Sequence, residues 1–158
     1  MLQDVVELGD LPFQVKFELL ETIFLDTIDN RTAATIQRLD GLGIHMEMDD
    51  FGSGHASIIA LLNLRPSTVK IDGRLVARIA EDDYRHRIVR SIVDLVTSLD
   101  INVTAEGVET EEQARILTEI GCHKLQGHYF SYPLSEKALL QAFGSELSRR
   151  QSGDGSAS

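Results

Sequence analysis

Short apolar runs alternate along this chain with segments whose apolar residues recur at helical spacing. The runs at 15–20, 44–48, 68–71, 101–105 and 124–128 are typical of strands. The segments with helical spacing cover 32–42, 55–64, 84–99, 110–120 and 135–147. This alternation predicts an α/β fold with parallel strands and helices outside the sheet.

Several predicted helices carry residues that begin or end helices. Gly43 and Gly121 follow the helices at 32–42 and 110–120, and glycine readily adopts the left-handed conformation at a helix C-terminus. Thr110, with Gln113 three residues later, predicts a capping box at the start of its helix. These boundaries keep the connections between elements short, as expected for repeated βα units.

Polar side chains lie at the end of every predicted strand. The carboxyl ends of parallel strands lie at one edge of an α/β sheet, so residues far apart in sequence converge there. The segments are Glu18-Leu19-Leu20-Glu21, Asp49-Asp50-Phe51-Gly52-Ser53-Gly54, Lys70-Ile71-Asp72, Glu106-Gly107-Val108-Glu109 and Gln126-Gly127-His128.

Asp49 and Asp50 are the most informative of these residues. Two carboxylates repel by roughly 4 kcal/mol at ~4 Å and an effective dielectric constant of ~20. A hard divalent cation with oxygen ligands offsets that repulsion, whereas two solvated loop aspartates need no cation. The polar residues at the other strand ends favour the cation site over the solvated pair.

Composition narrows the function classes. The chain has 158 residues, 42% of them hydrophobic, which fits one compact domain followed by a disordered tail at 148–158. Its net charge of −10 argues against binding to a nucleic acid polymer, but permits a phosphorylated ligand held through metal ions. Cys122 is the single cysteine, which favours a buried, inert thiol and a cytoplasmic protein. No apolar run approaches ~18 residues, so we expect no membrane segment.

Together, these motifs resemble the EAL domain, a cyclic di-GMP phosphodiesterase module. The resemblance covers roughly residues 10–147 and implies a TIM-type (β/α)8 barrel, a fold that typically needs ~250 residues. It assigns to this chain only the last five βα units, as a partial barrel and an incomplete EAL-like domain at 1–147. The Glu-Ala-Leu string that names the family does not occur in the sequence, and the strand with the family's metal-binding asparagine is also missing.

The resemblance also implies roles for individual residues. Lys70 would contact the reacting water and the ligand phosphate, Glu106 and Glu109 would join it as catalytic residues, and Gln126 would contact water or substrate. Glu109 would do so by orienting the lysine and the loop. The implied metal ligands are Glu18, Asp49, Asp50 and Glu106, and the implied loop residues are Glu21, Phe51, Gly52, Ser53 and Gly54.

The family reaction hydrolyses one phosphodiester bond of cyclic di-GMP to give pGpG and uses Mg²⁺ or Mn²⁺ at two metal positions. Without the Glu-Ala-Leu and asparagine strands, the resemblance implies an impaired or inactive site in the isolated chain. The alternative is a degenerate module that binds cyclic di-GMP or a protein partner in signalling. Five strands cannot close an eight-stranded barrel, so we expect a homo-oligomer or a partner domain that supplies strands.

Several positions depart from the family pattern, and two of them, Glu47 and His128, bear on the site. Glu47 stands where the family usually has a small residue, and strand alternation places it on the same face as Asp49. Because an unpaired buried charge is costly, Glu47 is either solvated in an open barrel or faces elsewhere. His128 stands where the family often has tyrosine, and we expect it to be a surface or packing histidine.

Overall fold

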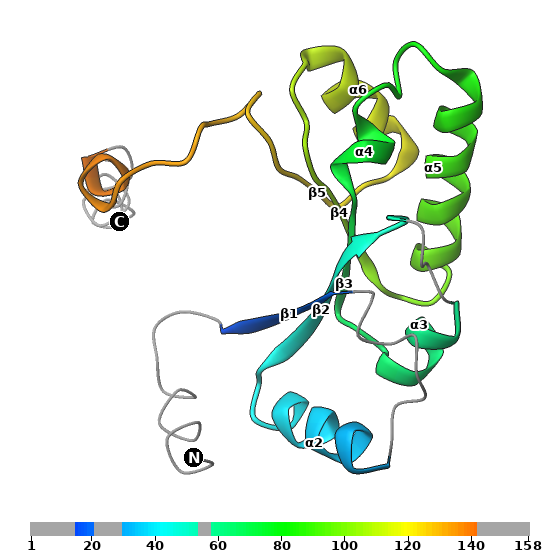
Figure 1. The fold of residues 1–158 in the computed structure, drawn as a ribbon, viewed down its shortest axis with the longest axis vertical. Helices are drawn as coiled ribbons and strands as arrows, with labels where there is room; N and C mark the ends of the chain where they lie inside the picture. The colour runs from blue at the N-terminus through cyan, green and yellow to red at the C-terminus, as the bar shows by residue number, and fades with distance from the viewer. Residues whose placement is uncertain (1–14, 21–29, 54–57, 142–158) are drawn as a thin grey trace, which may run out of the picture.

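The computed structural model describes residues 15–20, 30–53 and 58–141. A parallel five-stranded sheet in the order β1-β2-β3-β4-β5 forms its centre (Figure 1). This sequential parallel order is the one that successive βα units of a barrel produce. The predicted α/β fold is therefore confirmed. The strands are β1 (Lys16–Leu20), β2 (His45–Phe51), β3 (Thr68–Ile71), β4 (Asn102–Ala105) and β5 (Lys124–Leu125).

The helices follow the predicted order with one addition. The short helix α4 was not predicted because a single turn carries no measurable periodicity. Residues 136–141 are also helical, and Figure 1 shows that the segment leading to them extends away from the sheet. The labelled helices are α2 (Asn30–Asp40), α3 (Ile58–Leu64), α4 (Gly73–Val76), α5 (Asp83–Thr97) and α6 (Glu111–Ile120).

The predicted helix-end signals at α6 are confirmed. Thr110 and Gln113 form the capping box, with the Gln113 backbone N–H donating to the Thr110 hydroxyl at 3.2 Å. Gly121 ends the helix in the left-handed conformation, with φ of 106°. The chain therefore turns directly from α6 toward β5, as the sequence predicts.

The two faces of the sheet differ in chemistry. Alternate residues point to the helices and form the apolar core, including Met48 and Val69, which are fully buried. The register pairs Glu47 with Thr68 and Lys70 with Thr104, and all four of these buried residues are polar. The face away from the helices is therefore the polar face, and it carries the candidate site.

Glycines permit the close approach of the segments that follow the strands. A Cβ atom on Gly127 would lie 2.0 Å from the carbonyl oxygen of Val108. A Cβ atom on Gly107, whose φ is 67°, would lie 2.9 Å from the Cα atom of Gly73. Only glycine fits at such distances, so the segments after β3, β4 and β5 can gather at one end of the sheet.

Several predicted features lie outside the described residues: Glu21, Gly54, the start of the helix at 55–64, the end of the helix at 135–147 and the tail at 148–158. Within the described part, no helix has both the length and the apolar character needed to cross a membrane. Strands β1 and β5 form the two edges of the described sheet, and Phe17 and Leu20 of β1 are exposed.

Candidate metal centre

Lys70 lies at the centre of an ion-pair cluster whose carboxylates come from β1, from β2 and from the residue directly after β4. Its Nζ atom lies 2.9 Å from Glu18, 3.2 Å from Asp49 and 2.7 Å from Glu106. Lys70 is itself buried, so it does not extend into solvent from its strand. Carboxylates separated by as many as 88 positions in the sequence therefore converge on one ammonium group.

Lys70 remains charged in this environment. Burial disfavours the ammonium form, but the hydrogen bonds to Glu106, Glu18 and Asp49 outweigh that cost, and the pKa of Lys70 is raised above its ordinary value. The cluster therefore contains a fixed positive charge at neutral pH. That charge offsets part of the repulsion among the three carboxylates.

A β-bulge places the two aspartates. Met48 pairs with Val69 and Phe51 pairs with Ile71, so two residues of β2 stand opposite the single residue between them on β3. Asp50 adopts a left-handed conformation with φ of 56°, and its backbone N–H donates to Asp49 Oδ1 at 3.1 Å. In a regular strand, adjacent side chains point to opposite faces, so the bulge is what brings both carboxylates to one site.

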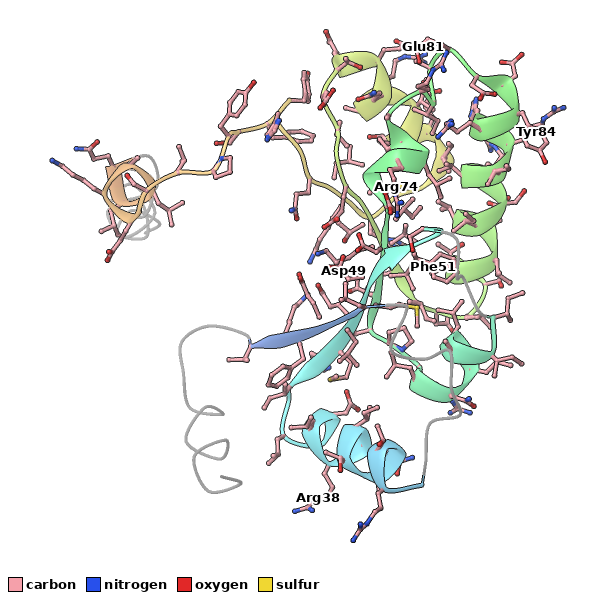
Figure 2. All side chains as sticks on the ribbon, in the orientation of Figure 1. Arg38, Asp49, Phe51, Arg74, Glu81 and Tyr84 are labelled. Carbon is pink, nitrogen blue, oxygen red and sulfur yellow. The ribbon has the colours of Figure 1, made fainter. Side chains whose placement is uncertain are left out.

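The bulge also positions the loop that follows it. Figure 2 labels Asp49 on the side of the sheet away from α5, whereas Phe51 lies toward α5 and is buried in the core. Gly52 has φ of 90°, and a Cβ atom there would lie 2.4 Å from Leu75 Cδ1. The backbone N–H of Ser53 donates to the carbonyl oxygen of Asp50 at 3.0 Å, which closes the turn.

Three carboxylates form the part of the site best suited to a cation. Asp49, Asp50 and Glu106 each offer one oxygen, and these oxygens lie within 4.8 Å of one another. All three residues are partly buried, and such oxygen ligands suit Mg²⁺ or Mn²⁺. Glu18 lies outside this trio, but reaches the site through Lys70. The donor set therefore fits a divalent metal ion.

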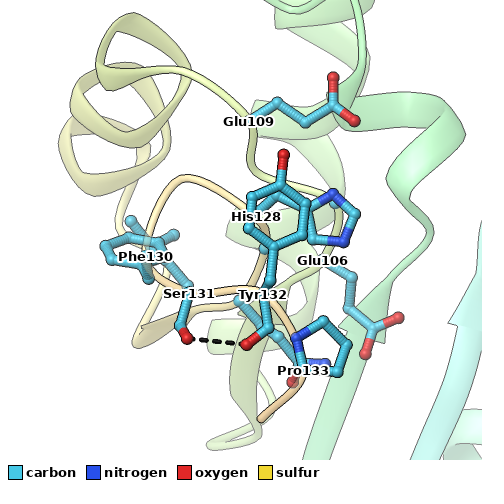
Figure 3. A pocket seen from close by; sticks show the side chains of 11 residues that line it. Glu106, Glu109, His128, Phe130, Ser131, Tyr132 and Pro133 are labelled. Carbon is cyan, nitrogen blue, oxygen red and sulfur yellow. Dashed lines mark hydrogen bonds between the residues drawn. The ribbon is translucent and has the colours of Figure 1, made fainter.

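A pocket of about 520 Å³ opens beside Glu106 (Figure 3). Glu109 and Gln126 also line it, and Figure 3 shows the carboxylates of Glu106 and Glu109 pointing in different directions. The ion pairs of Lys70 join it to Glu18, Asp49 and Glu106, and do not include Glu109. The structure therefore brings Glu109 to the pocket wall and not to the lysine.

Aromatic side chains form the outer wall of this pocket. The rings of His128 and Tyr132 stack with centroids 4.4 Å apart and an interplanar angle of 21°. His128 is exposed and lines the pocket together with Tyr132 and Phe130, which were not foreseen as pocket residues. The sequence feature that could have identified them is the run of aromatic residues shortly after β5, whose side chains are exposed and do not pack in the core.

Glu47 has a partner that the sequence reasoning missed. Lys16 Nζ lies 2.5 Å from Glu47 Oε1, and the Glu47 side chain is only 11% exposed. The carboxylate is thus neither solvated nor turned away from the polar face. Lys16 could have been found from the same alternation, since it lies two residues before Glu18 on the adjacent parallel strand.

Asp72, the last residue of the segment Lys70-Ile71-Asp72, has a structural role at the start of α4. Its carboxylate accepts the backbone N–H of Arg74 at 2.7 Å, which caps α4, and it also pairs with the Arg74 guanidinium. The hydrogen bond from that guanidinium lowers the pKa of Asp72 below its ordinary value. Position after a strand therefore does not by itself make a residue part of the site.

Comparison with known proteins agrees with this geometry. The EAL domain family matches residues 1–133, so the chain belongs to the EAL domain family. The bifunctional diguanylate cyclase/cyclic di-GMP phosphodiesterase MucR of Pseudomonas aeruginosa is 34% identical over 129 residues, which are 82% of this chain and 19% of MucR. The EAL domain of Mycobacterium smegmatis DcpA is similar with a TM-score of 0.80 at 28% identity, over 90% of this chain and 66% of that one.

A structure with ligands is also similar. A manganese/cyclic di-GMP complex of Klebsiella pneumoniae BlrP1 matches with a TM-score of 0.72 at 33% identity, over 83% of this chain and 33% of that one. The chain spans about a fifth of the length of the curated relatives it matches. The expected relationship to the EAL domain, a barrel-forming family, is thus confirmed, and this chain corresponds to part of such a domain.

Proposed function

We propose that this chain carries the later half of a metal-dependent cyclic di-GMP phosphodiesterase site, whose reaction gives pGpG. The observation that carries the proposal is the convergence of Asp49, Asp50 and Glu106 within 4.8 Å, beside the buried ammonium group of Lys70. Manganese and cyclic di-GMP occur together in the similar structure of BlrP1, which supports this choice of metal and substrate class.

The carboxylates and the lysine of the cluster would have different roles. Asp49, Asp50 and Glu106 would hold Mg²⁺ or Mn²⁺, with Glu18 as a further ligand from β1. A divalent ion, when bound, neutralises phosphate charge and favours ionisation of the attacking water. Lys70 is close enough to two of these carboxylates to face the same phosphate, where its charge would stabilise a developing oxyanion.

The adjoining pocket is the proposed place for the nucleotide. It begins at Glu106 and extends past Gln126 to exposed aromatic rings, including Tyr132. An amide side chain can hydrogen-bond to the ligand, and exposed aromatic faces can stack on a purine. A phosphate at the carboxylate cluster would thus leave room for a base in the pocket. Glu109, on the same wall, would orient the loop beside it.

A second function is favoured by one observation. The Glu18 side chain at the β1 edge is 52% exposed, so this side of the site is open in the described part of the chain. We propose, as the alternative, that the chain binds cyclic di-GMP without hydrolysing it. In either case, we propose that a second copy or a partner domain supplies strands along the β1 edge.

One assay separates these functions. The purified chain is incubated with cyclic di-GMP and Mn²⁺, and nucleotides are separated by chromatography while binding is measured in parallel. Formation of pGpG that is lost in Asp49→Asn supports the phosphodiesterase. Saturable binding without pGpG supports the alternative. Sedimentation of the same sample measures self-association, and absence of both binding and product from a self-associated sample overturns both proposals.

A further inference from the structure

Lys70 occupies the position of a cation among the proposed metal ligands. Its ammonium group contacts Asp49 Oδ1 at 3.2 Å and Glu106 Oε1 at 2.7 Å, and both residues belong to the trio that offers oxygens to a metal ion. A third carboxylate, Glu18, contacts the same ammonium group at 2.9 Å. The side chain of Lys70 is 8% exposed, so water does little to screen its contacts with the partly buried Asp49 and Glu106, whereas the contact with the half-exposed Glu18 is screened more.

We propose that Lys70 is an internal substitute for the divalent ion: it holds the carboxylates of three strands together before metal binds, and it competes with the metal for Asp49 and Glu106. This inference rests on the proposed metal site. It assigns to Lys70 a positioning role that is separate from any contact with phosphate.

The argument follows from the charges. Without a positive group, three carboxylates at strand ends would repel one another, and the ends of β1, β2 and β4 would separate. The ammonium group prevents this, since it is the cation that lies within 4.0 Å of all three in the described part of the chain. A metal ion that takes the same oxygens must share or displace this group, which costs part of its binding energy.

Replacing the ammonium group therefore has two opposite effects. In Lys70→Met, the metal-free chain should be less stable, because the carboxylates lose their common partner. The same variant should bind Mn²⁺ more tightly, because the metal no longer competes with a fixed positive charge. A lysine with a purely structural role would lower stability without tightening the metal site, so the pair of effects identifies the competition.

The test measures melting temperature and Mn²⁺ affinity for the unsubstituted chain, Lys70→Met and a control, Lys124→Met. Lys124 is an exposed residue on β5, which β4 separates from the strand of Lys70, and its removal changes the net charge equally. We expect Lys70→Met to melt at a lower temperature without metal, to gain more stability from Mn²⁺, and to bind it about tenfold more tightly. Lys124→Met should match the unsubstituted chain within about twofold.

Each outcome decides the inference. If Lys70→Met binds Mn²⁺ with equal or weaker affinity than the unsubstituted chain, Lys70 does not compete with the metal ion. The proposed metal site is not affected by that result. If the unsubstituted chain binds no Mn²⁺ at all, the proposed metal site is wrong and this inference is wrong with it. If Lys70→Met is unfolded without metal, refolding on addition of Mn²⁺ supports the inference, and failure to refold while Lys70→Arg folds overturns it.

Discussion

Lys16 and Glu47 form an ion pair of 2.5 Å between β1 and β2, two residues before Glu18 and Asp49 on their strands. The pair joins the edge strand β1 to its neighbour β2. Lys16 also provides the charge partner of the Glu47 carboxylate, which stands where the family usually has a small residue. Because β1 is an edge strand of the described sheet, this pair contributes to the position of Glu18.

The ion pair predicts non-additive effects on stability. Lys16→Met leaves the carboxylate of Glu47 partly buried and unpaired, which should lower the free energy of unfolding by about 1–3 kcal/mol. Lys16→Met combined with Glu47→Gln should recover part of that loss, since no buried charge remains. Urea unfolding of the two single variants and the double variant measures the coupling. Strictly additive losses would contradict the pairing.

Gly127 and Gly43 predict very different responses to the same substitution. Gly127→Ala would place a methyl group 2.0 Å from the Val108 carbonyl oxygen, so we expect a loss of more than about 3 kcal/mol in the free energy of unfolding. Gly43 has φ of 76° but no atom within 4 Å of an added Cβ, so Gly43→Ala should cost about 1 kcal/mol. Denaturant unfolding measures both, and equal losses would contradict the close approach at Gly127.

Cys122 predicts slow thiol chemistry. Burial raises the pKa of the Cys122 thiol to about 11, so the reactive thiolate is scarce at neutral pH. Labelling of the native chain by a disulfide reagent should therefore be slower than labelling in urea, and its rate should rise with pH up to about 11. The chain has one cysteine, which makes the readout specific. Labelling as fast in the native state as in urea would contradict a shielded thiol.

Asp72 predicts a contribution to stability that acid removes. Arg74 holds the pKa of Asp72 below its unfolded value, so this contribution is fully present above the unfolded pKa and is lost as the pH falls through the folded pKa. Asp72→Asn keeps a cap acceptor but removes the charge, and should cost about 1 kcal/mol at pH 7. Melting curves between pH 7 and about pH 2 should show the variant and the unsubstituted chain converging in acid. A constant difference would contradict the linkage.

The sequence predicted which residues come together at the site better than it predicted the detailed geometry of the site. Glu18, Asp49, Lys70 and Glu106 were expected to converge because parallel strands end at one edge, and they share contacts in the structure. The bulge at Asp50 was not foreseen, since a left-handed aspartate leaves no periodic pattern in the sequence.

The order of the elements in the fold was also predicted better than their exact ends. Apolar periodicity gave the order of strands and helices. However, β2 extends through Phe51, whereas its apolar run ends at Met48. Backbone pairing with β3 continues past the point where side-chain pattern predicts the strand to end. The partner of Glu47 was missed because alternation places Lys16 on the polar face but does not give the register of β1 against β2, which brings Lys16 within reach of Glu47.

The most direct test of the proposed site is calorimetric titration of Mn²⁺ into the chain and into Asp49→Asn, with Glu112→Gln as a surface control. Glu112 is an exposed carboxylate on α6, where it pairs with Arg115, and it is not one of the three carboxylates that offer oxygens to the metal ion. We expect saturable binding by the unsubstituted chain and the control, and at least about tenfold weaker binding by Asp49→Asn. Equal affinity of Asp49→Asn and the unsubstituted chain for Mn²⁺ would contradict a metal site at these strand ends.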